Sequence, residues 1–420
     1  MPALAYAPQP VRTDARPMTR RILELDGLRA LAIALVLGCH YEGFARLAHG
    51  LPEMGWVGVD VFFALSGYLI TSILLGLRGR QTPYKTFYSR RFIRILPPYF
   101  AVVLSLLMLG WHGHWLAHNA ARNQLLFLQG LSSSTLKPVV AFFTHPSLSY
   151  LTPLTLLAGR LPQGVAGLPA KLSNVFGTYW SLSIEEYFYV LWAPIVLRMP
   201  RRWIVYTGLA VCLIEPLLRW ISNNELSYFG LFFRFDALIY GAFLSLALEQ
   251  WRHSKAEELV RYLSAAALLA FTGLASILFA LRPFAGREVR ASGLVLVVGL
   301  PFISIAATAV VGLLVLKANT GWWPAKLLRS RPFQVVGTVS YTMYLVHIVA
   351  ATIVAKLLAT LHLAPASLLA ACLAAGLTLA WAQLAWRYLE NPLLQWKDRR
   401  FPNAPPPPYG GVGSTNSLTS

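Results

Sequence analysis

Long apolar segments recur along this chain from about residue 28 to about residue 390. Several of them exceed the roughly 18 residues that a helix needs to cross a bilayer. Of the 420 residues, 56% are hydrophobic and only 13% are charged, which is too apolar for a soluble domain of this size. We therefore expect a polytopic integral membrane protein with lipid around much of its surface.

The apolar segments predict an all-α fold, a polytopic integral membrane bundle of about ten transmembrane helices. The expected spans cover approximately residues 28–48, 56–78, 97–112, 180–198, 203–222, 229–251, 258–281, 292–316, 333–359 and 366–389. Residues 113–179 mix polar runs with apolar pieces, so we expect interfacial or re-entrant helices there.

Basic residues gather in alternate connections between these spans. They lie before the first span and after the second, fourth, sixth, eighth and tenth spans. Examples are Arg21, Arg78, Arg198, Arg252 and Lys326. The positive-inside rule makes this side cytoplasmic, which predicts a multi-pass protein of the cytoplasmic (inner) membrane with both termini in the cytoplasm. The net charge of +19 thus reports topology, and we expect membrane lipid and no nucleic acid as a partner.

The sequence divides into three parts. Residues 1–21 form a polar N-terminal tail without the apolar core of a signal peptide, and residues 22–392 form one transmembrane domain. Residues 393–420 form a C-terminal tail, first basic and then Pro/Gly/Ser-rich, which we expect to be disordered. The three cysteines lie far apart within apolar spans and indicate no disulfide framework.

Ionisable residues inside the spans are the first candidates for function, because each costs roughly 2.5–3.5 kcal/mol to insert. Arg29 and His40 lie eleven residues apart in the first span. This spacing brings them to nearly the same helix face, about 16 Å apart along the axis. Arg29 suits a phosphate or carboxylate near the cytoplasmic end, and His40 can exchange protons deeper in the membrane. The alternative is an arginine that reaches the headgroups and a histidine that only packs.

Polar residues also occur in the second and fourth spans. Asp60 lies near the outer end of the second span, and Ser66 lies in mid-membrane. Ser66 is a candidate nucleophile, although membrane serines usually hydrogen-bond to neighbouring helices. The fourth span opens with Trp180 and carries adjacent Glu185 and Glu186, which point about 100° apart. One of these carboxylates could face the histidine of the first span, orient its ring and raise its basicity.

The sixth and ninth spans supply the remaining candidates. Arg234 and Asp236 could contact a substrate, or they could neutralise each other as a structural pair. Ser340, Tyr344 and His347 could donate hydrogen bonds to a substrate, and a polar packing network explains them equally well.

A histidine cluster follows the third span. His112, His114 and His118 have a metal-like spacing, but they lie beside Trp111 and Trp115 without a nearby carboxylate or cysteine. An interfacial belt explains them better, so we expect no metal.

The sequence resembles the acyltransferase family 3 membrane proteins over about residues 22–392. The motifs that carry this resemblance are Leu25-Asp26-Gly27-Leu28-Arg29 with His40, Gly58-Val59-Asp60-Val61-Phe62-Phe63 with Leu65-Ser66-Gly67-Tyr68-Leu69-Ile70, Phe87-Tyr88-Ser89-Arg90-Arg91 with Arg94, Ile95, Pro97 and Tyr99, Trp180-Ser181-Leu182-Ser183-Ile184-Glu185, and Ser340-Tyr341 with Tyr344 and His347.

The resemblance implies transfer of an acyl group, acetyl in the first place, from cytoplasmic acyl-CoA to a hydroxyl of an extracytoplasmic carbohydrate. Acceptors in the family include O-antigen, exopolysaccharide, peptidoglycan and lipo-oligosaccharides. Some relatives carry a fused extracytoplasmic hydrolase-like domain, which we expect this chain to lack. It would then acylate a carbohydrate or glycolipid acceptor directly, unless a separate extracytoplasmic partner protein does so.

The family's essential arginine and histidine correspond to Arg29 and His40. The co-substrate would be acyl-CoA (acetyl-CoA), with phosphates held by Arg29, Arg90, Arg91 and Arg94; membrane-surface binding is the alternative role of the last three. His40 would act as a general base or carry a transient acyl group. Alternative functions are acylation of a small metabolite, such as a macrolide sugar, and transport or flipping of a substrate.

Overall fold

The computed structural model describes residues 22–47, 52–112, 178–222, 228–252, 254–280 and 293–401, and within these ranges the fold is all-α. Most of the expected interfacial segment, residues 113–177, lies outside the described residues. The helices are α1 (Leu23–His40), α2 (Glu42–Leu47), α3 (Val57–Leu77), α4 (Pro83–His112), α8 (Trp180–Arg198), α9 (Arg201–Ser222), α10 (Phe235–Trp251), α11 (Ala256–Ala280), α13 (Leu300–Leu316), α14 (Trp323–Leu328), α15 (Arg331–Thr360), α16 (Leu368–Ala385) and α17 (Asn391–Arg400). Short 3-10 turns are η1 (Pro52–Trp56) and η6 (Leu231–Phe233), and π-helical turns are η8 (Val295–Gly299) and η9 (Trp386–Glu390).

Seven helical segments of the described chain are long and apolar enough to cross a membrane. They are Met54–Leu77, Pro83–Met108, Arg201–Ser222, Ala256–Phe279, Val295–Leu316, Arg331–Thr360 and Leu368–Arg400. The prediction of a polytopic membrane protein is confirmed. A helix also lies at each of the three other expected spans, namely α1, α8 and α10. Helices α1 and α8 carry candidate charged residues, and α10 has only 17 residues.

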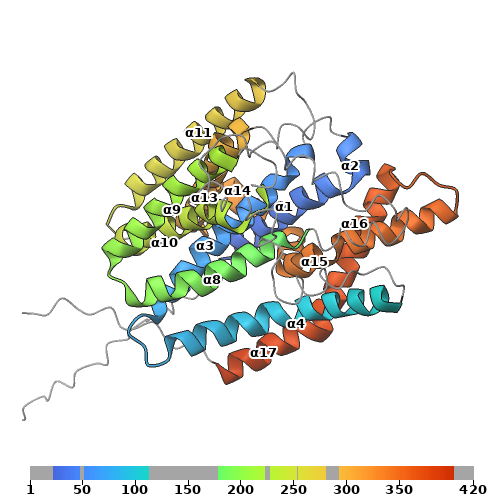
Figure 1. The fold of residues 1–420 in the computed structure, drawn as a ribbon, viewed down its shortest axis with the longest axis horizontal. Helices are drawn as coiled ribbons and strands as arrows, with labels where there is room; N and C mark the ends of the chain where they lie inside the picture. Colours follow the sequence, from blue (N-terminus) through green and yellow to red (C-terminus); the bar gives the residue numbers. More distant parts are fainter. Residues whose placement is uncertain are drawn as a thin grey trace, which may run out of the picture.

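The helices that carry charge lie inside the bundle. Helix α1 packs against α3 and α15, and α10 packs against α3, α9 and α13 (Figure 1). Helix α11 lies at the outside, where only a small share of its residues is buried, whereas the still more apolar α13 is mostly buried. Helices α4 and α17 run side by side along one edge (Figure 1). The inner position of the helices that carry charge follows from the cost of exposing a charged side chain to lipid.

Two glycines allow helices to cross at close range. A Cβ atom at Gly67 of α3 would lie 1.8 Å from the carbonyl oxygen of Leu238 in α10. A Cβ atom at Gly337 of α15 would lie 1.9 Å from the carbonyl oxygen of Asp26 in α1. Only glycine fits at such distances, so these two residues fix the approach of α10 to α3 and of α15 to α1.

The first helix ends earlier than expected. The span was expected to reach residue 48, but His40 is the last residue of α1, and Tyr41 is extended at φ −100° and ψ 103°. The Tyr41 hydroxyl donates to the backbone oxygen of His347 at 3.1 Å and lies 2.8 Å from Oγ1 of Thr378. These bonds give a physical reason for the break, because they tie the residue after His40 to α15 and α16.

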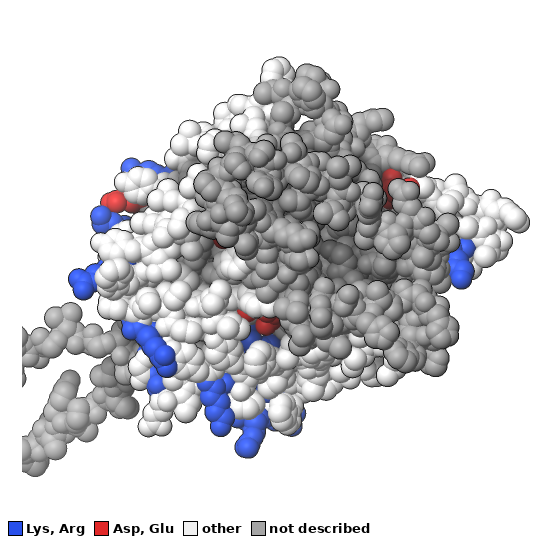
Figure 2. Space-filling model, viewed as in Figure 1, with Lys and Arg blue, Asp and Glu red and all other residues white. Residues whose placement is uncertain are grey.

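The basic connections meet at one end of the bundle, which we call the basic end. Arg78 after α3 donates to the backbone oxygen of Met199 after α8, at 2.8 Å. Arg201 at the start of α9 lies 3.0 Å from Glu249 near the end of α10. Figure 2 shows the visible lysines and arginines mostly along the left and lower margins, while much of the described surface between them carries no charge. The basic connections after α3, α8 and α10, which alternate along the sequence, therefore lie at the same end of the bundle.

Candidate functional site

A cavity of about 340 Å³ lies between α1, α3, α4, α8, α15 and the chain from η9 to α17. This volume is within the range of small-molecule sites. Eight of the candidate residues from the sequence line it, namely Arg29, Ser66, Arg91, Arg94, Glu185, Glu186, Ser340 and Tyr344. The fold therefore gathers residues from separate parts of the sequence around one space.

Three arginines supply positive charge to this cavity. Arg29 donates through Nη1 to Oδ1 of Asp26 at 2.6 Å, one turn earlier in α1. The guanidinium of Arg91 lies 4.9 Å from the centre of the Tyr189 ring. Within the described part of the chain, neither Arg91 nor Arg94 forms a salt bridge with a carboxylate. These two arginines can therefore bind an anionic ligand without breaking an ion pair.

Arg90 does not line the cavity. Its Nη2 lies 2.9 Å from Oδ1 of Asp398, and its Nη1 donates to the backbone oxygen of Phe401. Arg90 therefore ties α4 to the end of α17. Of the three α4 arginines expected at a phosphate site, the structure brings only Arg91 and Arg94 to the cavity.

Helix α17 adds lining residues that the sequence patterns did not single out. Leu394, Lys397 and Asp398 line the cavity, although by sequence they belong to the basic C-terminal tail. The signal that could have found them is the spacing of Leu394 and Lys397, which puts both on one face of a helix. Lys397 is almost buried, with 8% of its surface exposed, so its ammonium group is held at the cavity and not in open solvent.

The carboxylates of α8 face the same cavity. Glu185 accepts a hydrogen bond from the Tyr189 hydroxyl at 2.6 Å, and Glu186 also lines the space. Because Arg91 lies over the Tyr189 ring, Glu185 orients Arg91 through Tyr189. The ring of His40, which we expected one of these carboxylates to orient, instead contacts the backbone of Val36 and another imidazole.

Two histidines that do not line the cavity form a pair. The rings of His40 and His347 have centroids 4.9 Å apart and meet at 63°. Nδ1 of His40 lies 2.8 Å from the backbone oxygen of Val36. A carbonyl oxygen can only accept, so Nδ1 of His40 carries the proton and Nε2 of the neutral ring carries a lone pair. His40 as a residue is exposed.

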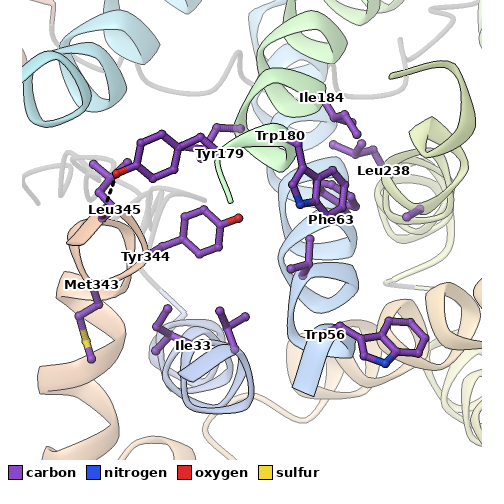
Figure 3. Packing of buried hydrophobic residues seen from close by; sticks show 14 of the residues in the cluster. Ile33, Trp56, Phe63, Tyr179, Trp180, Ile184, Leu238, Met343, Tyr344 and Leu345 are labelled. Carbon is purple, nitrogen blue, oxygen red and sulfur yellow. Dashed lines mark hydrogen bonds between the residues drawn. The ribbon is translucent and has the colours of Figure 1, made fainter. Parts of the chain in front are cut away.

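Tyr344 connects the cavity to this pair. Its hydroxyl lies 2.8 Å from Oγ of Ser181, and both residues line the cavity. The Tyr344 ring lies 5.6 Å from the His347 ring, measured between centroids. Figure 3 shows Tyr344 extending from α15 toward the helix that carries Phe63. The polar residues thus continue from the cavity to the histidines through α15.

The charged residues of the sixth span form different pairs from the one considered in the sequence. Arg234 does not pair with Asp236: its Nη2 lies 2.6 Å from Oδ1 of Asp60, while Asp236 lies 2.6 Å from Nη2 of Arg219. All four side chains are at most 2% exposed. Glu215 accepts from the backbone N–H of Asp236 at 2.8 Å and so caps α10. These ion pairs join α3, α9 and α10, and none of their residues lines the cavity.

Trp180 belongs to an aromatic cluster beside these ion pairs. Its ring meets those of Phe63 and Tyr228 at centroid distances of 6.1 and 5.1 Å (Figure 3 shows the first contact). Arg234 lies 4.6 Å from the centre of the Tyr228 ring. Trp180 therefore packs against the rings that Arg234 contacts, and it lies outside the cavity lining.

In the described ranges, no set of three His, Cys, Asp or Glu residues is placed to hold a metal ion. His114 and His118 lie outside the described residues.

Comparison with known proteins shows which family the chain belongs to. Residues 22–387 match the acyltransferase domain of the acyltransferase 3 family, which is most of the chain. The chain belongs to the acyltransferase 3 family. This membership confirms the resemblance drawn from the first-span arginine and histidine and the other motifs. No solved structure matches this acyltransferase 3 chain at a significant level.

Relatives of this acyltransferase 3 chain include three named O-acetyltransferases. The peptidoglycan O-acetyltransferase OatA of Listeria monocytogenes is 25% identical over 367 residues, which is 83% of this chain and 52% of the relative. The putative peptidoglycan O-acetyltransferase YrhL of Bacillus subtilis is 29% identical, covering 78% of this chain and 48% of the relative. The O-acetyltransferase OatA of Staphylococcus aureus is 26% identical, covering 77% and 49%. The chain spans about half the length of these curated relatives.

Proposed function

We propose that this acyltransferase 3 protein is an O-acetyltransferase that moves an acetyl group from acetyl-CoA to a hydroxyl of an extracytoplasmic carbohydrate. The observation that carries the proposal is the cavity that joins Arg29 of α1 to Arg91 and Arg94 of α4, with His40 at the far end of α1. The named activities of the relatives support acetyl as the group and a carbohydrate as the acceptor. The host membrane is proposed to be the cytoplasmic membrane, with the basic end and both termini inside.

The cavity suits the phosphate end of the donor. Arg91 and Arg94 provide charge without a carboxylate partner in the described chain, and Lys397 adds a third cation from α17. The acetyl-pantetheine arm then runs past Tyr344 toward His40. Arg29 and His40 are about 16 Å apart along α1, a span that suits this long arm. Ser66 and Ser340 line the route and can hydrogen-bond to its amide groups.

His40 performs the chemistry through the lone pair on Nε2. Nε2 removes the proton from the acceptor hydroxyl, the oxygen attacks the thioester carbonyl, and the carbon–sulfur bond breaks. The proton then passes from His40 to the departing thiolate, so the products are an acetyl ester and CoA thiol. In the alternative route, Nε2 attacks the thioester first and the acceptor hydroxyl receives acetyl from an acetyl-imidazole.

The proposal is tested by acetyl content. A deletion strain would be complemented with wild type, His40→Ala, Arg29→Ala or the exposed control Arg202→Gln, with equal protein levels verified in the membrane. We expect ester-linked acetyl on surface or secreted carbohydrate to return with wild type and Arg202→Gln only. Acetyl content unchanged by the deletion itself would contradict carbohydrate acetylation and favour a small-metabolite acceptor or transport. CoA release by the detergent-solubilised protein, which has no second compartment, separates these two remaining functions.

A further inference from the structure

Helix α17 carries a buried lysine at the cavity. Lys397 lines the space together with Leu394 and Asp398, and only 8% of its surface is exposed. It belongs to a run of charged residues whose ordinary place is in solvent, as it is for Arg399 and Arg400 on the same helix. Burying an ammonium group is costly unless an opposite charge meets it. The position of Lys397 therefore calls for an anion at this point of the cavity.

The carboxylate that meets Lys397 is shared with another cation. Nζ of Lys397 lies 3.5 Å from Oδ1 of Asp398, whereas Nη2 of Arg90 lies 2.9 Å from the same oxygen. A charge-assisted hydrogen bond from nitrogen to oxygen is about 2.7–2.9 Å long, so the bond from Arg90 is the stronger of the two. An ammonium group has three N–H donors. Lys397 therefore keeps donors for a further anion.

The other carboxylates that line the cavity do not serve Lys397. Three of them accept hydrogen bonds from close neighbours: Asp26 from Arg29, Glu185 from Tyr189 and Glu390 from Thr342. The fourth is Glu186 of α8. Among the residues that the structure describes, no salt bridge joins Lys397 to any of these four. The protein itself thus supplies Lys397 with only the shared carboxylate of Asp398.

Helix α4 holds this lysine in place. Arg90 of α4 also donates through Nη1 to the backbone oxygen of Phe401, and the N–H of Phe401 donates to the backbone oxygen of Lys397 at 2.7 Å. The two helices run side by side (Figure 1). Arg91 and Arg94 of the same α4 line the cavity. One helix therefore provides two of the cavity's cations and fixes the position of the third.

The exposure of the lining residues gives the order in which the donor lies in the cavity. Asp398, next to Lys397, has a side chain that is 59% exposed, which marks the open end. Ser181 and Tyr344, on the side of the histidine pair, are at most 7% exposed. Coenzyme A carries its thioester at one end, its pyrophosphate in the middle and a phosphate monoester on the ribose at the other end. When the thioester is directed toward His40, the ribose phosphate comes to the open end.

We propose that Lys397 binds the phosphate monoester on the ribose of the donor and thereby makes the protein selective for acetyl-CoA over acetyl-dephospho-CoA. The inference rests on the proposed acetyl transfer from acetyl-CoA. A phosphate monoester carries about −1.5 to −2 charges at neutral pH and three strong acceptor oxygens, which suit a buried ammonium group. Arg91 and Arg94 then bind the pyrophosphate. Lys397 contacts no reacting atom, so it acts on recognition of the donor and not on the chemical step.

The test compares two donors that differ only in the ribose phosphate. Steady-state kinetics would be measured with acetyl-CoA and with acetyl-dephospho-CoA for wild type, Lys397→Gln and the control Arg399→Gln, an exposed cation on the same helix. In wild type we expect a KM roughly 10- to 100-fold higher for acetyl-dephospho-CoA, with similar kcat. Lys397→Gln should raise the KM for acetyl-CoA by that factor and leave the KM for acetyl-dephospho-CoA unchanged. Arg399→Gln should keep the wild-type preference, and Lys397→Arg, which retains the charge, should keep most of it.

The pattern across donors separates this role from the alternatives. An equal rise in KM for both donors in Lys397→Gln would overturn the inference, because a packing role or a lipid headgroup bound by Lys397 would give that result. Equal KM values for the two donors in wild type would overturn it without any variant, so the test survives a Lys397→Gln protein that does not fold.

A binding measurement needs no turnover. Calorimetry of wild type in detergent should show CoA bound roughly 10- to 100-fold more tightly than dephospho-CoA, and Lys397→Gln should bind the two alike. Equal binding of both nucleotides by wild type would overturn the role of Lys397. Wild-type protein that prefers CoA but transfers no acetyl group would instead overturn the proposed function and leave the phosphate site standing.

Discussion

At the scale of single residues, the site combines two arginines, Arg91 and Arg94, that form no salt bridge in the described chain with a pair of histidine rings in edge contact. Arg91 rests on Tyr189, which is held by Glu185, and this chain of contacts orients the guanidinium toward the cavity. The buried pair of Asp60 and Arg234 has a different purpose, because it holds helices together away from the cavity. Substitutions at these two places should therefore affect different properties.

Arg91→Gln should weaken donor binding. Loss of one charge-assisted hydrogen bond to a phosphate costs about 1.5–3 kcal/mol, which corresponds to a KM for acetyl-CoA raised roughly 10- to 100-fold. We expect kcat to change little, because the donor phosphates lie far from His40. Steady-state kinetics with varied acetyl-CoA measures both values, with Arg202→Gln as the matched control. A drop in kcat at unchanged KM would contradict phosphate binding at Arg91.

Asp60→Ala should destabilise the fold. It leaves Arg234, which is 1% exposed, as a buried charge without its partner, and breaking such a pair costs about 3–5 kcal/mol. Thermal unfolding of the purified protein in detergent measures the loss. Glu249→Ala is the control, because its pair with Arg201 is partly exposed and such pairs contribute about 0–1 kcal/mol. Equal stability of the two variants would show that the buried pair does not hold α3 to α10.

At the scale of helices, the site depends on how closely α15 approaches α1. Gly337 of α15 is both a lining residue of the cavity and the point of contact with the Asp26 backbone. The π-helical turn η9 also matters here, because Trp386 and Glu390 at its two ends both line the cavity. A change in helix spacing should reach the cavity directly.

Gly337→Ala should separate α1 from α15. The added methyl group would lie 1.9 Å from a backbone oxygen, and overpacking of this kind typically costs about 1–3 kcal/mol. We expect a lower melting temperature and weaker acetyl-CoA binding together. Gly376→Ala is the control, because a Cβ atom there meets nothing within 4 Å, so alanine should be neutral or stabilising. A Gly337→Ala protein as stable as Gly376→Ala would contradict the tight crossing.

Helix positions were largely predictable from the sequence, whereas helix ends and partners were not. Hydropathy located a helix in every expected span, but the third span was expected to begin near residue 97, and the structure begins α4 at Pro83, with Pro97 and Pro98 inside the helix. Proline is unfavourable inside a helix on local grounds, and tertiary packing of α4 overrides that preference. The same limit applies to Arg234 and Asp236, because sequence distance does not reveal that their ion-pair partners come from other helices.

At the scale of the whole molecule, the prediction concerns sidedness. The account puts the basic end and the donor cavity in the cytoplasm, and the connection between α15 and α16 outside. In a variant without native cysteines, Ala364→Cys should react with a membrane-impermeant maleimide in intact cells. Ser254→Cys, between α10 and α11, should react only after the membrane is opened. Labelling of Ser254→Cys in intact cells would reverse the proposed topology and with it the side from which the donor enters.

Some of the candidate site residues were predictable from the sequence, because charged residues are conspicuous within apolar spans. Charge within an apolar span is costly, so Arg29, Glu185 and Glu186 stand out in the sequence, and all three line the cavity. Lys397 does not stand out, because it follows the last span in a segment whose composition is typical of a tail. The pairing of His40 with His347 was also hidden, since 307 residues separate them and only the fold brings the rings together.

The most direct test of the central claim is transfer across the host's own membrane. Inside-out vesicles from the deletion strain, carrying wild type or His40→Ala, would receive radiolabelled acetyl-CoA at the exposed cytoplasmic face. The account predicts label in alkali-labile ester linkage to carbohydrate on the enclosed face with wild type, and a rate reduced about 100-fold or more with His40→Ala. Equal labelling of the two preparations would contradict the assignment of acetyl transfer to His40.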